Sequence, residues 1–158
     1  MEEARVKNLI ETWYQKSCFE QDVFSKFIFL WICFNVVLDY QSKKNSDREM
    51  IDWLVGQTKD SSDLIAEFEQ AKKTEPFLKS LKALVAMAPI DDSKLVRPSV
   101  KIRDVDDRGN IIRALYRIRC NLFHGGKEAN NARDQKLVTL AQRILEKWIG
   151  NLINSWRI

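Results

Sequence analysis

The residues best suited to acid–base chemistry lie in one short segment, YRIRCNLFHGGK, at positions 116–127. It contains the only histidine of the chain, His124. Imidazole is the one side chain that titrates near neutral pH without a special environment, so a mechanism that moves a proton near pH 7 has His124 as its first candidate. Arg119 would add a guanidinium, whose planar donors match the oxygens of a phosphate.

The geometry of this segment depends on where its helix ends. Positions five residues apart on a straight helix point roughly 140° apart, so Arg119 and His124 would not share a face. Gly125 and Gly126 directly follow His124 and are a helix-stop signal. We therefore expect the helix to end at His124, where a tightened or unwound last turn lets the imidazole swing toward Arg119.

A structural interpretation of the same residues stays open. A histidine and an arginine at a helix end can cap carbonyl groups and pair with carboxylates, here Asp104, Asp106 or Asp107. Cys120 and His124 also have the i, i+4 spacing of two metal ligands. No third and fourth ligand is evident nearby, so we expect no metal site. The sequence has no glycine-rich phosphate loop either, and we expect no cofactor.

Composition and charge define the class of protein. The chain has 158 residues, 45% of them hydrophobic, with five Trp and eight Phe. That is enough for one buried core, so we predict a single folded domain over residues 1–158. Residues 1–100 carry 14 Lys+Arg against 16 Asp+Glu, whereas residues 101–158 carry 12 against 6. This basic C-terminal third is compatible with an anionic ligand and equally with solvated helix faces.

The cysteines and the apolar segments bear on localisation. Three widely spaced cysteines, Cys18, Cys33 and Cys120, are typical of reduced thiols and favour the cytoplasm. The N-terminal segment MEEARVKNLIE lacks the basic-then-apolar order of a signal peptide. The longest apolar run, residues 27–38, is too short to cross a bilayer. We expect a cytoplasmic protein with a buried core helix and no membrane association.

Hydrophobic periodicity predicts an all-α fold, a bundle of six or seven helices. The predicted helices cover about 2–16, 20–41, 46–55, 61–73 and 76–87, followed by two clear apolar stripes over 111–122 and 137–156. Ser46 and Glu49 have the spacing of a capping box, and Gly56 is expected to end that helix. From about 88 to 107 the periodicity fails, which predicts a long irregular loop of functional interest.

The segment LYRIRCNLFHGGK resembles the signature of the HEPN superfamily, an arginine followed after four to six residues by a histidine at a helix end. The helix FIFLWICFNVVLDY resembles the aromatic first core helix of the larger members. The resemblance covers about two helices. It implies an up-and-down helical bundle, usually dimerised so that two motif helices line one cleft, and nuclease members that cleave RNA without a metal.

Carried onto this sequence, the resemblance implies that Arg119 and His124 are catalytic and that Asn121 is a polar helper. One position departs from the pattern, because the residue after the motif arginine is commonly polar and here it is Cys120. The basic and aromatic residues around the motif would bind the substrate: Arg113, Tyr116, Arg117 and Lys127.

Three functions follow as hypotheses. The first is a metal-independent endoribonuclease in which the RNA 2′-OH attacks the adjacent phosphorus, acting as a toxin, a defence effector or an RNA-processing enzyme. Because one histidine per chain limits a two-proton mechanism, we expect a homodimer. The second is a catalytically inactive HEPN module that binds a nucleotide or RNA, or docks onto a partner such as a nucleotidyltransferase-type antitoxin. The third is a helical interaction domain without a nucleic-acid role.

Overall fold

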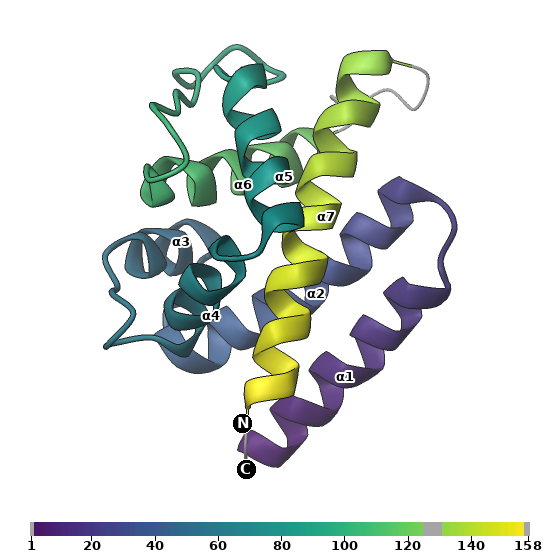
Figure 1. Cartoon of the computed structure of the whole chain (residues 1–158), viewed down its shortest axis with the longest axis vertical. Helices are drawn as coiled ribbons and strands as arrows, with labels where there is room; N and C mark the ends of the chain where they lie inside the picture. Colours follow the sequence, from purple (N-terminus) through teal and green to yellow (C-terminus); the bar gives the residue numbers. More distant parts are fainter. Residues whose placement is uncertain (1, 125–130, 157–158) are drawn as a thin grey trace.

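The computed structural model describes residues 2–124 and 131–156, and this part of the chain folds into seven α-helices without a β-strand. The predicted all-α fold is confirmed. The helices are α1 (Glu3–Phe19), α2 (Val23–Ser42), α3 (Asp47–Val55), α4 (Asp63–Lys72), α5 (Glu75–Met87), α6 (Arg108–Phe123) and α7 (Ala132–Ser155). In Figure 1, α7 runs along the length of the molecule, with α1 on one side of it and α3 and α4 on the other.

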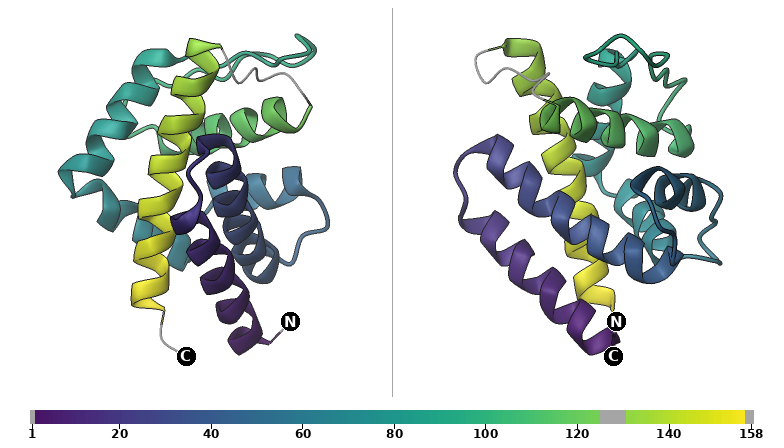
Figure 2. Two further views of the ribbon diagram at one scale, coloured as in Figure 1. Left: turned by 90° about the vertical axis from the view of Figure 1, so that its right-hand side faces the viewer. Right: turned by 180° about the vertical axis from the view of Figure 1, so that it is seen from behind.

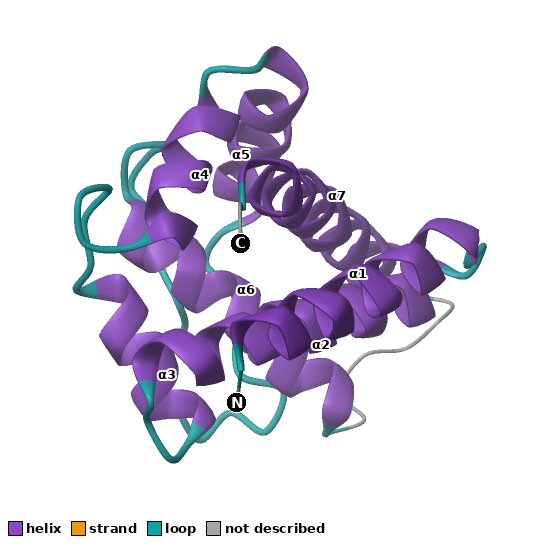
Figure 3. Cartoon of the chain, turned by 90° about the horizontal axis from the view of Figure 1, so that it is seen from below, coloured by secondary structure: helices purple, strands orange, loops and turns teal. Residues whose placement is uncertain are grey.

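The core is built around α2 and α7, which pack against each other and against α1. Trp148 of α7 is fully buried between Phe34 of α2 and Phe68 of α4, with ring centroids 5.0 Å from each. Its indole Nε1 donates to the carbonyl of Leu64 at 2.7 Å, so the buried polar atom is satisfied. Figure 3 shows α1, α2 and α7 grouped on one side and α3 and α4 on the other.

α2 is the most apolar helix of the chain. By length and composition it could span a membrane, with 20 residues and a mean hydropathy of 1.6 over its best window. A single such helix is weak evidence, because the buried core helix of a globular domain passes the same test. Phe34, Val37 and Leu38 are buried here among the helices that pack on α2, as the sequence predicted for a core helix.

The first two helices differ from their predicted bounds at the turn between them. α1 continues to Phe19, and α2 begins at Val23 instead of near Glu20. Asp22 explains the later start, because its carboxylate accepts a hydrogen bond from the Ser25 N–H at 3.0 Å and caps the first turn. Periodicity alone gives the register of a helix but not the residue that caps it.

The capping box predicted for α3 is present with one difference. The Ser46 hydroxyl accepts from the Glu49 N–H at 3.2 Å, while the Glu49 carboxylate accepts from the N–H of Asn45 and not from that of Ser46. Gly56 caps the other end, as expected. This cap fixes the start of α3 and places Asp47 in its first turn.

The segment from residue 88 to 107 is irregular, as predicted. Its two arms are joined by an isolated antiparallel bridge between Ile90 and Val100, with N–H to carbonyl distances of 2.8 and 2.9 Å. Figure 2, right, shows this segment beside α6, which crosses the back of the molecule. The loop therefore lies against the helix that carries the predicted catalytic residues.

Candidate functional site

The predicted end of the motif helix is confirmed. α6 ends at Phe123, and His124 is its C-cap residue, with its backbone N–H donating to the Cys120 carbonyl at 3.0 Å. The His124 side chain is exposed. Lys127, predicted to bind substrate, lies outside the described residues.

Arg119 is held between an acidic residue and an aromatic ring. Its Nη2 lies 3.2 Å from Oδ2 of Asp47 in the first turn of α3, and its guanidinium lies 4.4 Å from the centroid of the Phe123 ring. The Arg119 side chain keeps 21% of its surface exposed. The structural interpretation expected a pair with Asp104, Asp106 or Asp107, but the partner is Asp47. The guanidinium thus stacks on the residue that directly precedes His124.

The two predicted catalytic side chains are near each other along α6 but are not bonded. Within residues 2–124 and 131–156, no hydrogen bond joins Arg119 to His124, and Arg119 Nε is buried without a hydrogen-bond partner. The contact between the two side chains that the sequence predicted at the unwound turn stays a prediction. Asp47 engages Nη2, and Nη1 donates only a long, weak hydrogen bond of 4.0 Å to Cys120 Sγ, so Nη1 keeps donor capacity.

The structure places Asn121, which the resemblance implied as a polar helper, against the 88–107 loop. Asn121 is buried, with only 3% of its surface exposed. Both ends of its side-chain amide form hydrogen bonds with the 88–107 loop. Nδ2 donates to the Asp91 carbonyl at 2.8 Å, and Oδ1 accepts from the Ser93 N–H at 2.9 Å. Because its donor and acceptor are engaged, Asn121 holds the loop on α6, and its role as a polar helper stays a prediction.

Arg117 binds the same loop one turn earlier on α6. Its Nη1 donates to the Ile90 carbonyl at 3.2 Å and its Nη2 to the Pro98 carbonyl at 3.0 Å. The two carbonyls belong to opposite arms of the loop. Backbone groups of an irregular segment need partners outside regular secondary structure, and Arg117 and Asn121 supply them. The loop therefore has a defined conformation where it meets α6.

A small cavity of about 250 Å³, the arginine pocket, opens between α3, α6 and this loop. Four residues of α6 at i, i+3, i+4 and i+7 spacing share the face that lines it. The pocket unites three of the four residues predicted to bind substrate and adds Arg48 and Arg97, which sequence reasoning missed. Its principal polar residues are Arg48, Arg97, Arg113, Tyr116, Arg117 and Cys120.

The arginine pocket has a strong excess of positive charge. Arg113 pairs with Asp52 at 2.8 Å. Arg48 and Arg97 are exposed, and neither guanidinium forms an ion pair or hydrogen bond with another residue in the described ranges. Four guanidinium groups around one small cavity attract anions, and their planar donors favour phosphate or carboxylate oxygens.

Tyr116 contributes a neutral hydroxyl to this pocket. Burial raises the pKa of Tyr116 to about 12, and its hydrogen bond with Cys120 adds to the shift. Its ring stacks on Trp31 of α2 with centroids 6.2 Å apart, which fixes the side chain against the core. Tyr116 therefore stays protonated at neutral pH and can donate to a bound anion.

Metal and thiol chemistry find little support in the described ranges. No group of three or more His, Cys, Asp or Glu side chains there could hold a metal ion. The three cysteines are free thiols. Cys33 is buried, with Sγ 3.4 Å from the Ile10 carbonyl, and burial raises its pKa to about 12. Cys18 is exposed, whereas Cys120 is partly exposed beside the arginine pocket.

Comparison with known proteins adds no relative, since no protein-family model, curated protein or solved structure matches this chain. The HEPN resemblance of the motif helix therefore remains a prediction. The site has to be interpreted from its own residues.

Proposed function

We propose that this protein is a metal-independent endoribonuclease of the HEPN type, with its reaction centre at the C-terminal end of α6. One observation carries the proposal. The helix end presents an exposed His124 directly after the Phe123 ring on which Arg119 stacks, and the same helix lines a pocket of four arginines. An acid–base group and cations for phosphate thus occur on one helix.

The chemistry that suits these groups is attack of the RNA 2′-OH on the adjacent phosphorus. The 2′-oxygen loses its proton as the new P–O bond forms, and the bond to the 5′-oxygen breaks as that oxygen gains a proton. His124 would transfer protons, and Arg119 would neutralise the charge that develops on the phosphoryl oxygens. The products would be a 2′,3′-cyclic phosphate and a 5′-hydroxyl end.

One imidazole cannot serve both proton transfers at once, and a homodimer would bring a second His124 to the same cleft. Mixing Arg119→Ala and His124→Ala proteins under subunit exchange tests this, because each mixed dimer keeps one intact Arg119 and one intact His124 in different chains. Recovered cleavage would show that one Arg119 and one His124 from different chains suffice, without a second imidazole. No recovery in verified mixed dimers would mean that the productive pair lies within one chain or that both pairs are required. A protein that stays monomeric by light scattering at micromolar concentration yet cleaves RNA fully contradicts it.

The arginine pocket would bind a neighbouring phosphate of the same RNA strand. Arg48 and Arg97 have no partner of their own in the described part of the chain, so they can bind phosphate without breaking an existing pair. Arg117 is used differently, because its two carbonyl contacts hold the wall of the pocket. Backbone-phosphate contacts of this kind position the strand and make binding salt-dependent.

Asp47 orients the proposed catalytic arginine. The ion pair directs Nη2 toward α3, Nη1 makes only a long contact of 4.0 Å with Cys120 Sγ, and Nε is buried. A substrate phosphate would therefore bind Nη1 in place of the thiol, or bind Nη2 by displacing the carboxylate. Both modes keep Arg119 as a cation, because a guanidinium does not lose its proton in a protein.

The second candidate is a catalytically inactive module that binds RNA or a nucleotide in the arginine pocket. The observation that favours it is the commitment of two motif side chains to structural contacts, Arg119 to Asp47 and Asn121 to the loop. Docking of a partner such as a nucleotidyltransferase-type antitoxin belongs to this alternative.

A cleavage assay on end-labelled single-stranded RNA in EDTA separates the two candidates. We expect the wild-type protein and Arg5→Ala, a matched control at an exposed arginine of α1, to cut the RNA, and His124→Ala to be inactive. Cleavage that requires an added divalent ion would contradict the proposed mechanism. Salt-sensitive RNA binding without cleavage by the wild-type protein would favour the binding module.

A further inference from the structure

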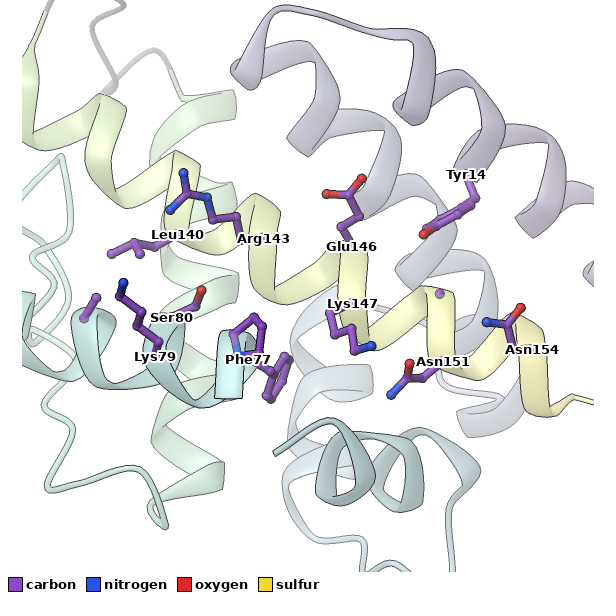
Figure 4. A pocket seen from close by; sticks show the side chains of 13 residues that line it. Tyr14, Phe77, Lys79, Ser80, Leu140, Arg143, Glu146, Lys147, Asn151 and Asn154 are labelled. Atoms are coloured by element: carbon purple, nitrogen blue, oxygen red, sulfur yellow. The ribbon is translucent and has the colours of Figure 1, made fainter. Parts of the chain in front are cut away.

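A second, larger cavity lies away from the end of α6. It is a groove of about 620 Å³ between α5 and α7, with Tyr14 of α1 at one end, and we call it the α5–α7 groove (Figure 4). None of its lining residues lines the arginine pocket. The groove is therefore a separate site that the proposed function does not use.

The groove carries uncompensated positive charge. Lys79 projects from α5 and Arg143 and Lys147 from α7, and in the described ranges none of the three forms an ion pair. The single carboxylate of the lining, Glu146, is already paired with Lys26 at 3.3 Å and accepts from Gln142 at 2.7 Å. The remaining charge is that of three cations, which favours an anionic ligand.

The two ends of the groove differ in chemistry. In Figure 4, Lys79 and Arg143 lie toward one end and come from opposite helices, while Asn151 and Asn154 lie toward the other end beneath Tyr14. Two cations on opposite walls suit a phosphate or carboxylate. Two carboxamides offer both donors and acceptors, which suits a polar heterocycle.

Two buried apolar side chains also line the groove, Leu140 near the Lys79 and Arg143 end and Phe77 nearer the middle (Figure 4). Phe77 of α5 is 2% exposed and Leu140 of α7 is 5% exposed. A cavity of several hundred cubic ångströms that combines apolar side chains with a few convergent polar groups is typical of small-molecule sites. An extended polyanion would not need the apolar side chains, so the lining favours a small organic anion.

Tyr14 and Gly150 shape the polar end. Burial raises the pKa of Tyr14 to about 12, with the thiol of Cys18 and the carboxylate of Glu146 adding to the shift, so its hydroxyl is a protonated donor at neutral pH. A Cβ at position 150 would come within 2.8 Å of the Tyr14 hydroxyl. Because Gly150 has no side chain, the Tyr14 hydroxyl can lie at the edge of the groove.

We infer that the α5–α7 groove binds a small phosphate ester of nucleotide size, with its phosphate between Lys79 and Arg143 and its polar ring against Asn151, Asn154 and the Tyr14 hydroxyl. This site is independent of cleavage at α6. A protein that failed to cut RNA would still bind such a ligand.

Isothermal titration calorimetry with the four nucleoside 5′-monophosphates, ribose 5-phosphate, the matched nucleosides and inorganic phosphate tests this inference. At least one nucleotide should bind about tenfold or more tightly than its nucleoside and than inorganic phosphate, because charged hydrogen bonds and ring contacts both contribute. The double variant Lys79→Gln/Arg143→Gln should weaken that binding by at least about tenfold. Lys82→Gln, at an exposed position of α5 outside the groove, should leave it unchanged.

Four outcomes would overturn the inference. The first is no binding of any nucleotide at millimolar concentration, and the second is equal binding of nucleotide and inorganic phosphate or ribose 5-phosphate. The third is loss of binding in Arg48→Gln/Arg97→Gln but not in the groove variant, which would assign the ligand to the arginine pocket. The fourth is a groove variant that binds nucleotide unchanged but has a different molecular mass by light scattering. That result would make the groove an interface between chains.

Discussion

Replacement of Asn121 by alanine separates a positioning role from a catalytic one. The substitution removes two hydrogen bonds, from Nδ2 to the Asp91 carbonyl and from the Ser93 N–H to Oδ1, and empties a site that is only 3% exposed. A buried polar group left without a partner costs about 1–3 kcal/mol. Asp91 and Ser93 are exposed residues, so water can replace part of the loss and the lower end of that range applies to each bond.

The expected cost of Asn121→Ala is therefore about 2 kcal/mol in the free energy of unfolding, from roughly 1 kcal/mol for each hydrogen bond. Urea denaturation followed by circular dichroism measures it, with the midpoint falling at an unchanged slope. Asn8→Ala, at an exposed position within α1, is the matched control and should change stability by no more than about 0.5 kcal/mol.

A second measurement follows the loop directly. If Asn121 fixes the 88–107 segment, the amide of Ser93 should lose protection from hydrogen exchange in Asn121→Ala and keep it in Asn8→Ala. Asn121→Ala with wild-type stability and wild-type exchange at Ser93, but without RNA cleavage, would refute this reasoning. That result would return Asn121 to the catalytic role implied by the family resemblance.

Three further predictions concern the motif helix and the groove. His124→Ala should leave the unfolding midpoint unchanged because the side chain is exposed, whereas Arg119→Ala should cost about 1 kcal/mol through loss of the Asp47 pair and the Phe123 stack; equal stability of both variants would show that these contacts contribute nothing. Gly150→Ala should raise stability by about 0.5–1 kcal/mol only in a Tyr14→Phe background, since the methyl group otherwise meets the hydroxyl at 2.8 Å; the same effect in both backgrounds, measured by thermal unfolding, would contradict the clash. RNA with a single 2′-deoxy substitution at the cut site should resist cleavage there, and mass spectrometry of the normal products should find a 2′,3′-cyclic phosphate; cutting of the deoxy substrate at a similar rate would exclude attack by the 2′-OH.

The sequence alone determined the local structure of this protein. Helical periodicity predicted the helices, and the pairs Ser46–Glu49 and His124–Gly125 marked the start of α3 and the end of α6. These signals work because a helix repeats every 3.6 residues and its caps lie within three or four residues of the groups that they satisfy. The same periodicity, by failing between residues 88 and 107, predicted the loop.

The composition of the candidate sites was decided only by tertiary structure. Arg48 and Arg97 join Arg113 in one pocket although nothing in their sequence spacing relates them, and Asp47, not a nearby aspartate of the loop, pairs with Arg119. Such contacts depend on how the apolar faces of α3, α6 and α7 pack, and packing is set by shape and volume across the whole core. The spacing of residues along the chain does not reveal how the helices pack. The sequence therefore identified the motif helix but not the residues that surround it.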